Sequence, residues 1–105
     1  MKIDNIFNRI PKDLSKEVFE NIVSSNNLKI ERIISKNNGT EKKWYDQNEN
    51  EFVLIIQGDA ELLFEKNKKI LMKRGDYIII PKHKKHRVIR TSEKEETIWL
   101  AVFYK

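Results

Sequence analysis

The two histidines of the chain, His83 and His86, lie three residues apart in the run from Gly75 to Arg90. A neutral imidazole is a common metal ligand and titrates near neutral pH, so His86 is the first candidate for a metal ligand or an acid-base group, and His83 is the second. Another interpretation stays open, in which the run is an ordinary solvated loop, because five basic residues surround the histidines: Lys82, Lys84, Lys85, Arg87 and Arg90.

A bend between two strands is expected to hold both histidines. Gly75-Asp76 is a turn signal, Tyr77 to Ile80 is a β-branched run that ends at Pro81, and a further apolar run begins at Val88. A bend at the end of a strand can direct a side chain into a cavity. The pattern therefore predicts that the histidines lie beside the interior of a sheet structure.

From residue 28 onward the chain has a β pattern. Turn signals stand at Asn37-Asn38-Gly39 and Gly58-Asp59, and no helical pattern interrupts the series. Short strands at regular intervals predict a sandwich or barrel rather than alternating strands and helices. The expected strands are 28–35, 51–57, 60–64, 70–72, 77–80, 87–90 and 97–104.

The segment from Pro11 to Val23 is the one helix predicted. Leu14, Val18 and Ile22 repeat at i, i+4 and i+8, which gives an apolar stripe, and Pro11 supplies a start signal. A helix of this length is marginal alone and must pack on other structure. The chain is therefore expected to be mainly β with a short N-terminal helix, as one domain over 1–105 with a helical segment at 1–27 and a barrel at 28–105.

Two of the expected strands carry apolar residues on both faces. In 51–57 Val53 and Ile55 alternate with Phe52, Leu54 and Ile56, and 97–104 shows the same alternation. An antiparallel sheet usually leaves one face polar, so a second apolar face needs cover. The N-terminal helix, a partner subunit in a homodimer, or both are expected to provide it.

Composition excludes several classes of protein. The 105 residues are 39% hydrophobic, which suits one core, and the absence of cysteine excludes disulfides, thiolate metal sites and a cysteine nucleophile. The chain begins without a signal-peptide pattern and lacks an apolar run long enough to span a membrane, so a soluble, cytoplasmic protein without membrane contact is expected. Its net charge is +5, but the basic residues are spread among 16 acidic ones, and no nucleic-acid partner is expected.

The spacing around the histidines resembles the second motif of the cupin superfamily. Five residues separate Gly75 from Pro81, His83 stands where glycine is usual, and His86 follows after two residues. The first cupin motif is present in reduced form, with Gly39 and Gly58 as its glycines and with six residues between Glu51 and Gly58. Its two histidines are missing: one register puts Tyr45 and Gln47 at those positions, and the other puts Trp44 and Asp46 there.

The resemblance spans residues 28–104 and is to small single-domain bacterial cupins with a Trp44-Tyr45-Asp46-Gln47 block. It implies a double-stranded β-helix, which is a jelly-roll barrel with a pocket inside. The implied ligands of a divalent metal ion are Asp46, Gln47, Glu51 and His86. Oxygen donors in place of two imidazoles favour harder cations, and manganese, iron(II), zinc and nickel all stay open. A barrel in which Glu51 and His86 form a hydrogen-bonded pair without metal is the alternative.

Two functional classes follow from the resemblance. The first is a metal-dependent enzyme that acts on a small metabolite, with His83 and Tyr45 as catalytic candidates. The second is a non-catalytic cupin that binds a small molecule or acts as a sensor, since a barrel by itself does not fix a function. In both classes the expected pocket residues are Trp44, Tyr45, Tyr77 and Trp99.

Overall fold

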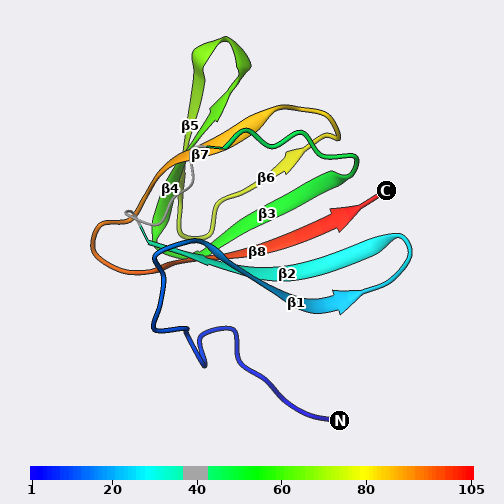
Figure 1. Cartoon of the computed structure of the whole chain (residues 1–105), viewed down its shortest axis with the longest axis vertical. Coiled ribbons are helices and arrows are strands. Elements are labelled where there is room, and N and C mark those ends of the chain that lie inside the picture. The colour runs from blue at the N-terminus through cyan, green and yellow to red at the C-terminus, as the bar shows by residue number, and fades with distance from the viewer. Residues whose placement is uncertain (37–42) are drawn as a thin grey trace.

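The structure, a computed structural model, describes residues 1–36 and 43–105. Its strands form two antiparallel sheets that face one another (Figure 1). A short 3-10 turn (Glu65–Asn67) follows the fourth strand. The strands are β1 (Val18–Ser24), β2 (Leu28–Ser35), β3 (Asn50–Gln57), β4 (Asp59–Phe64), β5 (Lys68–Lys73), β6 (Tyr77–Ile80), β7 (His86–Thr91) and β8 (Thr97–Tyr104).

The strand order joins distant parts of the chain. The larger sheet runs β1-β2-β8-β3-β6, and the smaller one runs β5-β4-β7. Trp99 of β8, for example, lies opposite Ile33 of β2 on one side and Ile55 of β3 on the other. These two sheets are consistent with the double-stranded β-helix, so the prediction of a mainly β chain is confirmed. The Asn37-Asn38-Gly39 turn lies outside the described residues.

The helix predicted from Pro11 to Val23 is wrong. Residues 11–17 are irregular, and the rest of the segment belongs to β1, which pairs antiparallel with β2 through Val18 opposite Ile34 and Phe19 opposite Ile33. A helix of about three turns with one apolar stripe gains little stability by itself, whereas β1 pairs with β2 on both sides of a bulge between Asn21 and Val23 and so adds backbone hydrogen bonds to the sheet. No residue of the described part of the chain is α-helical, and none of it forms a helix that could cross a membrane.

The core lies between the two sheets. It is built from the inward-facing positions of the strands, where every second side chain is buried. Trp99 is 3% exposed, and its indole Nε1 donates a hydrogen bond to the hydroxyl of Ser35 at 3.1 Å. The other members include Ile33, Val53, Ile55, Ala60, Leu62, Phe64, Met72, Ile80, Val88, Ala101 and Phe103.

Part of the outer face of the larger sheet is covered by the segment before β1, which lies outside the two sheets (Figure 1). Buried Arg32 of β2 holds this segment in place. Its guanidinium donates to the carbonyls of Ile6 at 2.9 Å, Asn8 at 2.6 Å and Arg9 at 3.2 Å, and to the Glu20 carboxylate at 2.6 Å. The N-terminal segment therefore covers part of this face at β2 as an irregular segment rather than a helix, and the cover expected for β3 and β8 stays a prediction.

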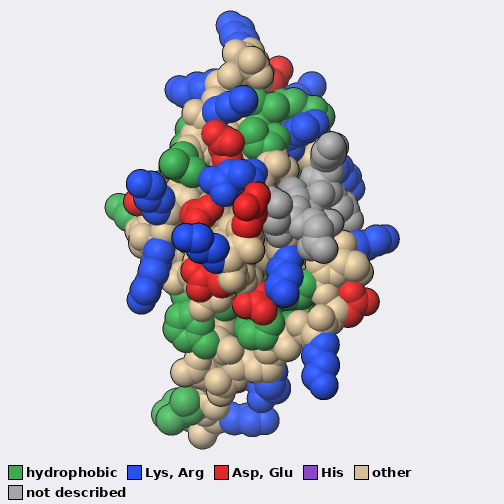
Figure 2. Space-filling model, turned by 90° about the vertical axis from the view of Figure 1, so that its left-hand side faces the viewer, with side chains coloured by type: hydrophobic (Ala, Val, Ile, Leu, Met, Phe, Trp, Pro, Cys, Tyr) green, Lys and Arg blue, Asp and Glu red, His purple; other side chains and the backbone are tan. Residues whose placement is uncertain are grey.

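The remainder of that outer face is apolar and partly exposed. Tyr77 is 65% exposed and Ile79 56% exposed on β6, while Phe52 and Leu54 beside them on β3 are half-buried. The rings of Phe52 and Tyr77 lie 5.3 Å apart. Elsewhere the surface is highly charged, and on the face drawn in Figure 2 acidic and basic side chains are interspersed.

Candidate functional site

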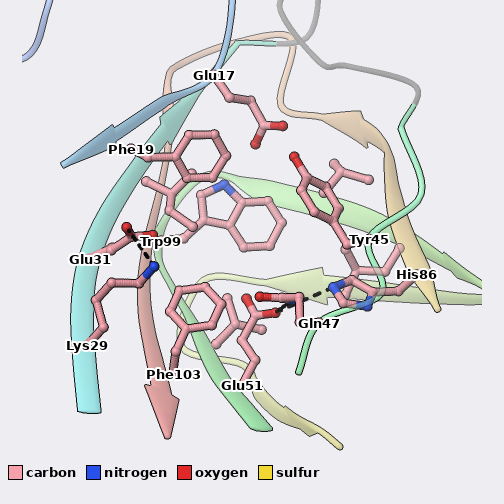
Figure 3. Close-up of a pocket in the computed structure, with 14 residues that line it drawn as sticks. Glu17, Phe19, Lys29, Glu31, Tyr45, Gln47, Glu51, His86, Trp99 and Phe103 are labelled. Atoms are coloured by element: carbon pink, nitrogen blue, oxygen red, sulfur yellow. Dashed lines mark hydrogen bonds and ion pairs between the residues drawn. The ribbon is translucent and has the colours of Figure 1, made fainter. Parts of the chain in front are cut away.

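A cavity of about 270 Å³ opens between the inner faces of the two sheets (Figure 3). Its walls are largely aromatic and aliphatic, and its polar groups lie in separate places. Gln47, Glu51 and His86 lie together at one end, and Glu17, Lys29 and Glu31 lie nearer β1 and β2. The aromatic walls are Phe19, Tyr45, Trp99 and Phe103.

The polar end of the cavity is a chain of three side chains, which we call the Gln47–Glu51–His86 chain. Gln47 Nε2 donates to Glu51 Oε1 at 2.8 Å, and the same oxygen lies 3.4 Å from His86 Nε2. His86 Nδ1 lies 2.8 Å from the backbone carbonyl of Lys84. Because a carbonyl only accepts hydrogen bonds, Nδ1 carries a proton, and Nε2 is the atom that gains or loses one.

This environment changes the acidity of His86. The side chains of His86 and Glu51 are only 7% and 9% exposed. Burial acts to lower the pKa of His86, but the hydrogen bond and charge of Glu51, together with the Lys84 carbonyl, outweigh burial and raise that pKa above its ordinary value of 6.5. An imidazole whose pKa is raised by a neighbouring carboxylate can take up a proton from a bound molecule.

The pKa of His86 predicts a pH dependence of stability. Because protonated His86 is favoured by the fold, its stabilising contribution is complete below about pH 6.5 and is lost as the pH rises through the folded pKa. Denaturant unfolding between pH 6 and 9 should show this loss in the wild type, and Glu51→Gln should reduce it. Equal pH profiles for the two proteins would contradict the assignment of Glu51 as the cause.

Backbone pairing positions Tyr45 and Gln47 in the cavity. Tyr45 forms an isolated β-bridge with His86: the nitrogen of Tyr45 lies 2.7 Å from the carbonyl oxygen of His86, and the nitrogen of His86 lies 3.1 Å from that of Tyr45. The amide of His83 donates to the Gln47 carbonyl at 2.7 Å. Side chains of an extended segment alternate, so Tyr45 and Gln47 point inward while Asp46 is exposed. Asp46 lies 3.0 Å from His83 Nδ1 at the rim.

The predicted metal ligands are therefore only partly assembled. Glu51, His86 and Gln47 converge, whereas Asp46 pairs with His83 outside the cavity. Among the described residues no three His, Cys, Asp or Glu side chains converge on one point. One carboxylate, one imidazole and one amide are three of the four implied donors, so the four-ligand centre is not complete among the described side chains. The ligand assignment stays a prediction.

The other candidate residues fall in three places. Tyr45 and Trp99 line the cavity. Trp44 is 42% exposed, with the Arg87 guanidinium 5.6 Å from its ring, and Tyr77 lies on the outer face of the larger sheet. His83 is exposed and does not line the cavity; its backbone φ of 65° explains why glycine suits this position. Roles in catalysis or ligand binding for these residues stay predictions.

Several cavity residues escaped the sequence analysis. Glu17 and Phe19 were hidden by the helix assignment, because a helical pattern gives no sheet face to which they belong. Lys29 and Glu31 share the inward face of β2 with Ile33, two residues apart in each case. The alternation of Lys29, Glu31 and Ile33 indicates that the three side chains share one face of the strand. Because two of the three are charged, the pattern predicts a face that points to solvent, whereas this face points into the cavity.

Comparison with known proteins agrees with the fold. A family model described as a cupin domain matches residues 33–103. A solved protein of Ralstonia eutropha, described as a "putative mannose-6-phosphate isomerase", is 34% identical, covers 100% of this chain and 99% of its own, and superposes with a TM-score of 0.91. A search of curated proteins found no significant match.

Two further solved structures share the fold at lower identity. An RmlC-like cupin of Desulfovibrio desulfuricans is 19% identical, with 98% of this chain and 96% of that chain covered and a TM-score of 0.77. Iron(II)-bound HppE is 16% identical, with 85% of this chain and 50% of that chain covered and a TM-score of 0.73. These two likenesses concern the fold alone.

Proposed function

The chain is a member of the cupin family, and from this premise we propose that its barrel binds a small polar metabolite and transfers a proton with the Glu51–His86 pair. The observation that carries the proposal is the buried contact of 3.4 Å between Glu51 Oε1 and His86 Nε2 at the polar end of the cavity. Reactions that move a proton next to a carbonyl, such as isomerisation and epimerisation, need one group of this kind.

Each member of the Gln47–Glu51–His86 chain has a separate task in this mechanism. Neutral His86 Nε2 takes a proton from the carbon next to the substrate carbonyl, and the Glu51 carboxylate stabilises the resulting imidazolium until that proton is returned to the substrate to form the product. Gln47 holds the carboxylate from the other side at 2.8 Å, and the Lys84 carbonyl fixes the ring through Nδ1. The apolar walls limit water around the reacting atoms and so strengthen these interactions.

The name of the Ralstonia eutropha protein supports the reaction class. That protein is described as an isomerase, and isomerisation between an aldose and a ketose is a proton rearrangement next to a carbonyl. The name bears on the kind of reaction only. The substrate of this chain depends on the cavity's own residues.

A metabolite screen tests the proposal. Trp99 forms a wall of the cavity and Trp44 is the second tryptophan of the chain, so Trp44→Phe leaves one fluorescent reporter at the site. A ligand found by a change in Trp99 emission should exchange a carbon-bound hydrogen for deuterium in heavy water when the protein is added. A ligand that binds to the cavity without exchange or conversion would instead establish the binding or sensor function.

The divalent-metal hypothesis has its own measurement. Metal analysis of protein purified without a chelating tag should find less than one equivalent of manganese, iron, zinc or nickel, because Glu51 and His86 are the only strong donors that the described residues bring together at the site. One equivalent that is retained by the wild type and lost in His86→Ala, but not in His83→Ala, would favour the metal-dependent enzyme.

We also propose that the protein is a homodimer. Tyr77, Ile79, Phe52 and Leu54 leave an apolar area on the outer sheet face that the N-terminal segment does not cover. A stable interface there needs about 1,500 Å² of buried surface in total. Sedimentation at micromolar concentration should give twice the 12.6 kDa mass of one chain, and a monomer would contradict the proposal.

A further inference from the structure

Acidic groups dominate the polar lining of the cavity. Glu17, Glu31 and Glu51 all line it, and the carboxylate of Glu17 points into the part of the cavity opposite the Gln47–Glu51–His86 chain (Figure 3). Among the described lining residues, Lys29 is the only lysine or arginine. With these glutamates and Lys29 ionised, the charge of the described lining is negative whether His86 is neutral or protonated.

Lys29 is already engaged with its neighbours. Its Nζ lies 3.6 Å from Glu31 Oε2 and 4.9 Å from the centre of the Phe103 ring. A ligand anion would have to compete with Glu31 for this ammonium. The arrangement also shows that the aromatic wall accepts a positive charge over a ring face, which is the geometry of a cation–π contact.

The devices by which proteins bind phosphate are missing from the described lining. Phosphate groups are usually held by arginine forks or by the N-terminus of a helix. The described lining contains no arginine, and the described strands and loops bring no α-helix to the cavity. Phe19, Tyr45, Trp99 and Phe103 instead offer four aromatic rings beside the carboxylates.

We propose that the ligand of this cavity carries an ammonium group, as a small amine or quaternary ammonium compound, and no phosphate. The ammonium lies between the aromatic walls and the Glu17 and Glu31 carboxylates, and a hydroxyl or carbonyl of the same ligand reaches the Glu51–His86 pair. The inference rests on the proposed function in taking the same cavity as the site, and it adds the charge of the ligand. It separates this chain from a sugar-phosphate isomerase in substrate, although the fold is shared.

Three probes of one shape test the sign of the charge. Choline is cationic, 3,3-dimethylbutan-1-ol replaces its ammonium nitrogen by carbon and is neutral, and 3,3-dimethylbutanoate is anionic, with its carboxylate at the end where the alcohol has its hydroxyl. Binding is followed by Trp99 emission in the Trp44→Phe protein. The dissociation constant of choline should be at least about tenfold lower than that of the alcohol, which is the gain expected from one cation–π contact together with one partly exposed glutamate. The anion 3,3-dimethylbutanoate should bind most weakly of the three.

A double variant identifies the residues responsible. Glu17→Gln with Glu31→Gln keeps the shape of the cavity, leaves Glu51 in place and removes the carboxylate that Lys29 contacts, so the preference for choline should disappear. Glu93→Gln with Glu95→Gln makes the same charge change on the exposed loop between β7 and β8 and should alter no constant by more than about twofold.

The outcomes separate this inference from the proposed function. Failure of choline to bind, or binding of the anion as tight as that of choline, overturns the inference and leaves the proton-transfer test open to other ligands. A preference for choline that survives the double variant also overturns it. A cationic metabolite that binds with the expected dependence on Glu17 and Glu31, but never exchanges a proton, supports the inference and removes the proposed catalysis.

Discussion

Replacing Glu51 by glutamine is expected to lower the turnover of the metabolite found by the screen by about 10²- to 10⁴-fold, the range that one acid-base group contributes. The amide has the size of the carboxylate but no negative charge, so it cannot stabilise protonated His86 at 3.4 Å. His86→Asn should cost as much, because it removes the proton carrier. Solvent deuterium exchange into the metabolite measures both effects, with binding followed separately by Trp99 emission.

His83→Asn is the matched control for these variants. It removes an imidazole three residues from His86, but from an exposed side chain that pairs with Asp46 and does not line the cavity. A change in turnover of less than about threefold is expected. If His83→Asn abolished turnover and left binding intact, the proton carrier would lie at the rim, as the sequence analysis proposed for His83.

The largest expected loss of stability comes from Gly58→Ala. Gly58 joins β3 to β4 at a φ of 82°, and a Cβ atom there would lie 2.5 Å from Thr97 Oγ1 and 3.0 Å from Thr97 Cα. Thr97 is fully buried and its hydroxyl donates to the Asp59 carbonyl, so it cannot move aside easily. Backbone strain of about 1–2 kcal/mol and overpacking of about 1–3 kcal/mol together predict a loss of about 3 kcal/mol in unfolding free energy.

Gly75→Ala isolates the backbone contribution. Gly75 has a φ of 90°, close to that of Gly58, but no atom lies within 4 Å of its added Cβ. Its cost should therefore be the strain alone, about 1–2 kcal/mol. Denaturant unfolding of the two variants gives the difference, and equal losses would show that contact with Thr97 is not what excludes a side chain at Gly58.

The β framework could be predicted because its signals are local. A strand or its end is marked within a few residues by signals such as the alternation in β3 and β8 and the glycine turn at Gly58. Signals of this kind predict the seven strands from β2 to β8. β1 could not be predicted in this way. Leu14, Val18 and Ile22 fit a helical stripe, and only pairing with β2, through Val18 opposite Ile34, decides in favour of a strand.

In the candidate site, too, local sequence signals predict some residues, and contacts between distant segments fix the others. Glu51 and His86 follow motif spacing, and the structure places them 3.4 Å apart. The orientation of Asp46 and Gln47 depends on the β-bridge of Tyr45 with His86 and on the pairing of Asp46 with His83. These are contacts between segments about 40 residues apart, and neither spacing nor residue type specifies them. The sequence leaves open whether Tyr45 and Gln47 or Trp44 and Asp46 stand at the positions of the two missing histidines. In the structure Tyr45 and Gln47 point into the cavity, while Trp44 and Asp46 are exposed.

The hydrogen bonds of Arg32 determine how readily the N-terminal segment detaches from the sheet and becomes open to proteolysis. A protease must draw several residues of chain into an extended conformation in its active site, and the carbonyls of Ile6, Asn8 and Arg9 are all bonded to this one guanidinium. The segment is therefore expected to detach as a unit when these three hydrogen bonds break, without unfolding of the sheets. Cleavage after Arg9 would report that local opening rather than global unfolding, so a chain shortened by trimming can keep an intact barrel.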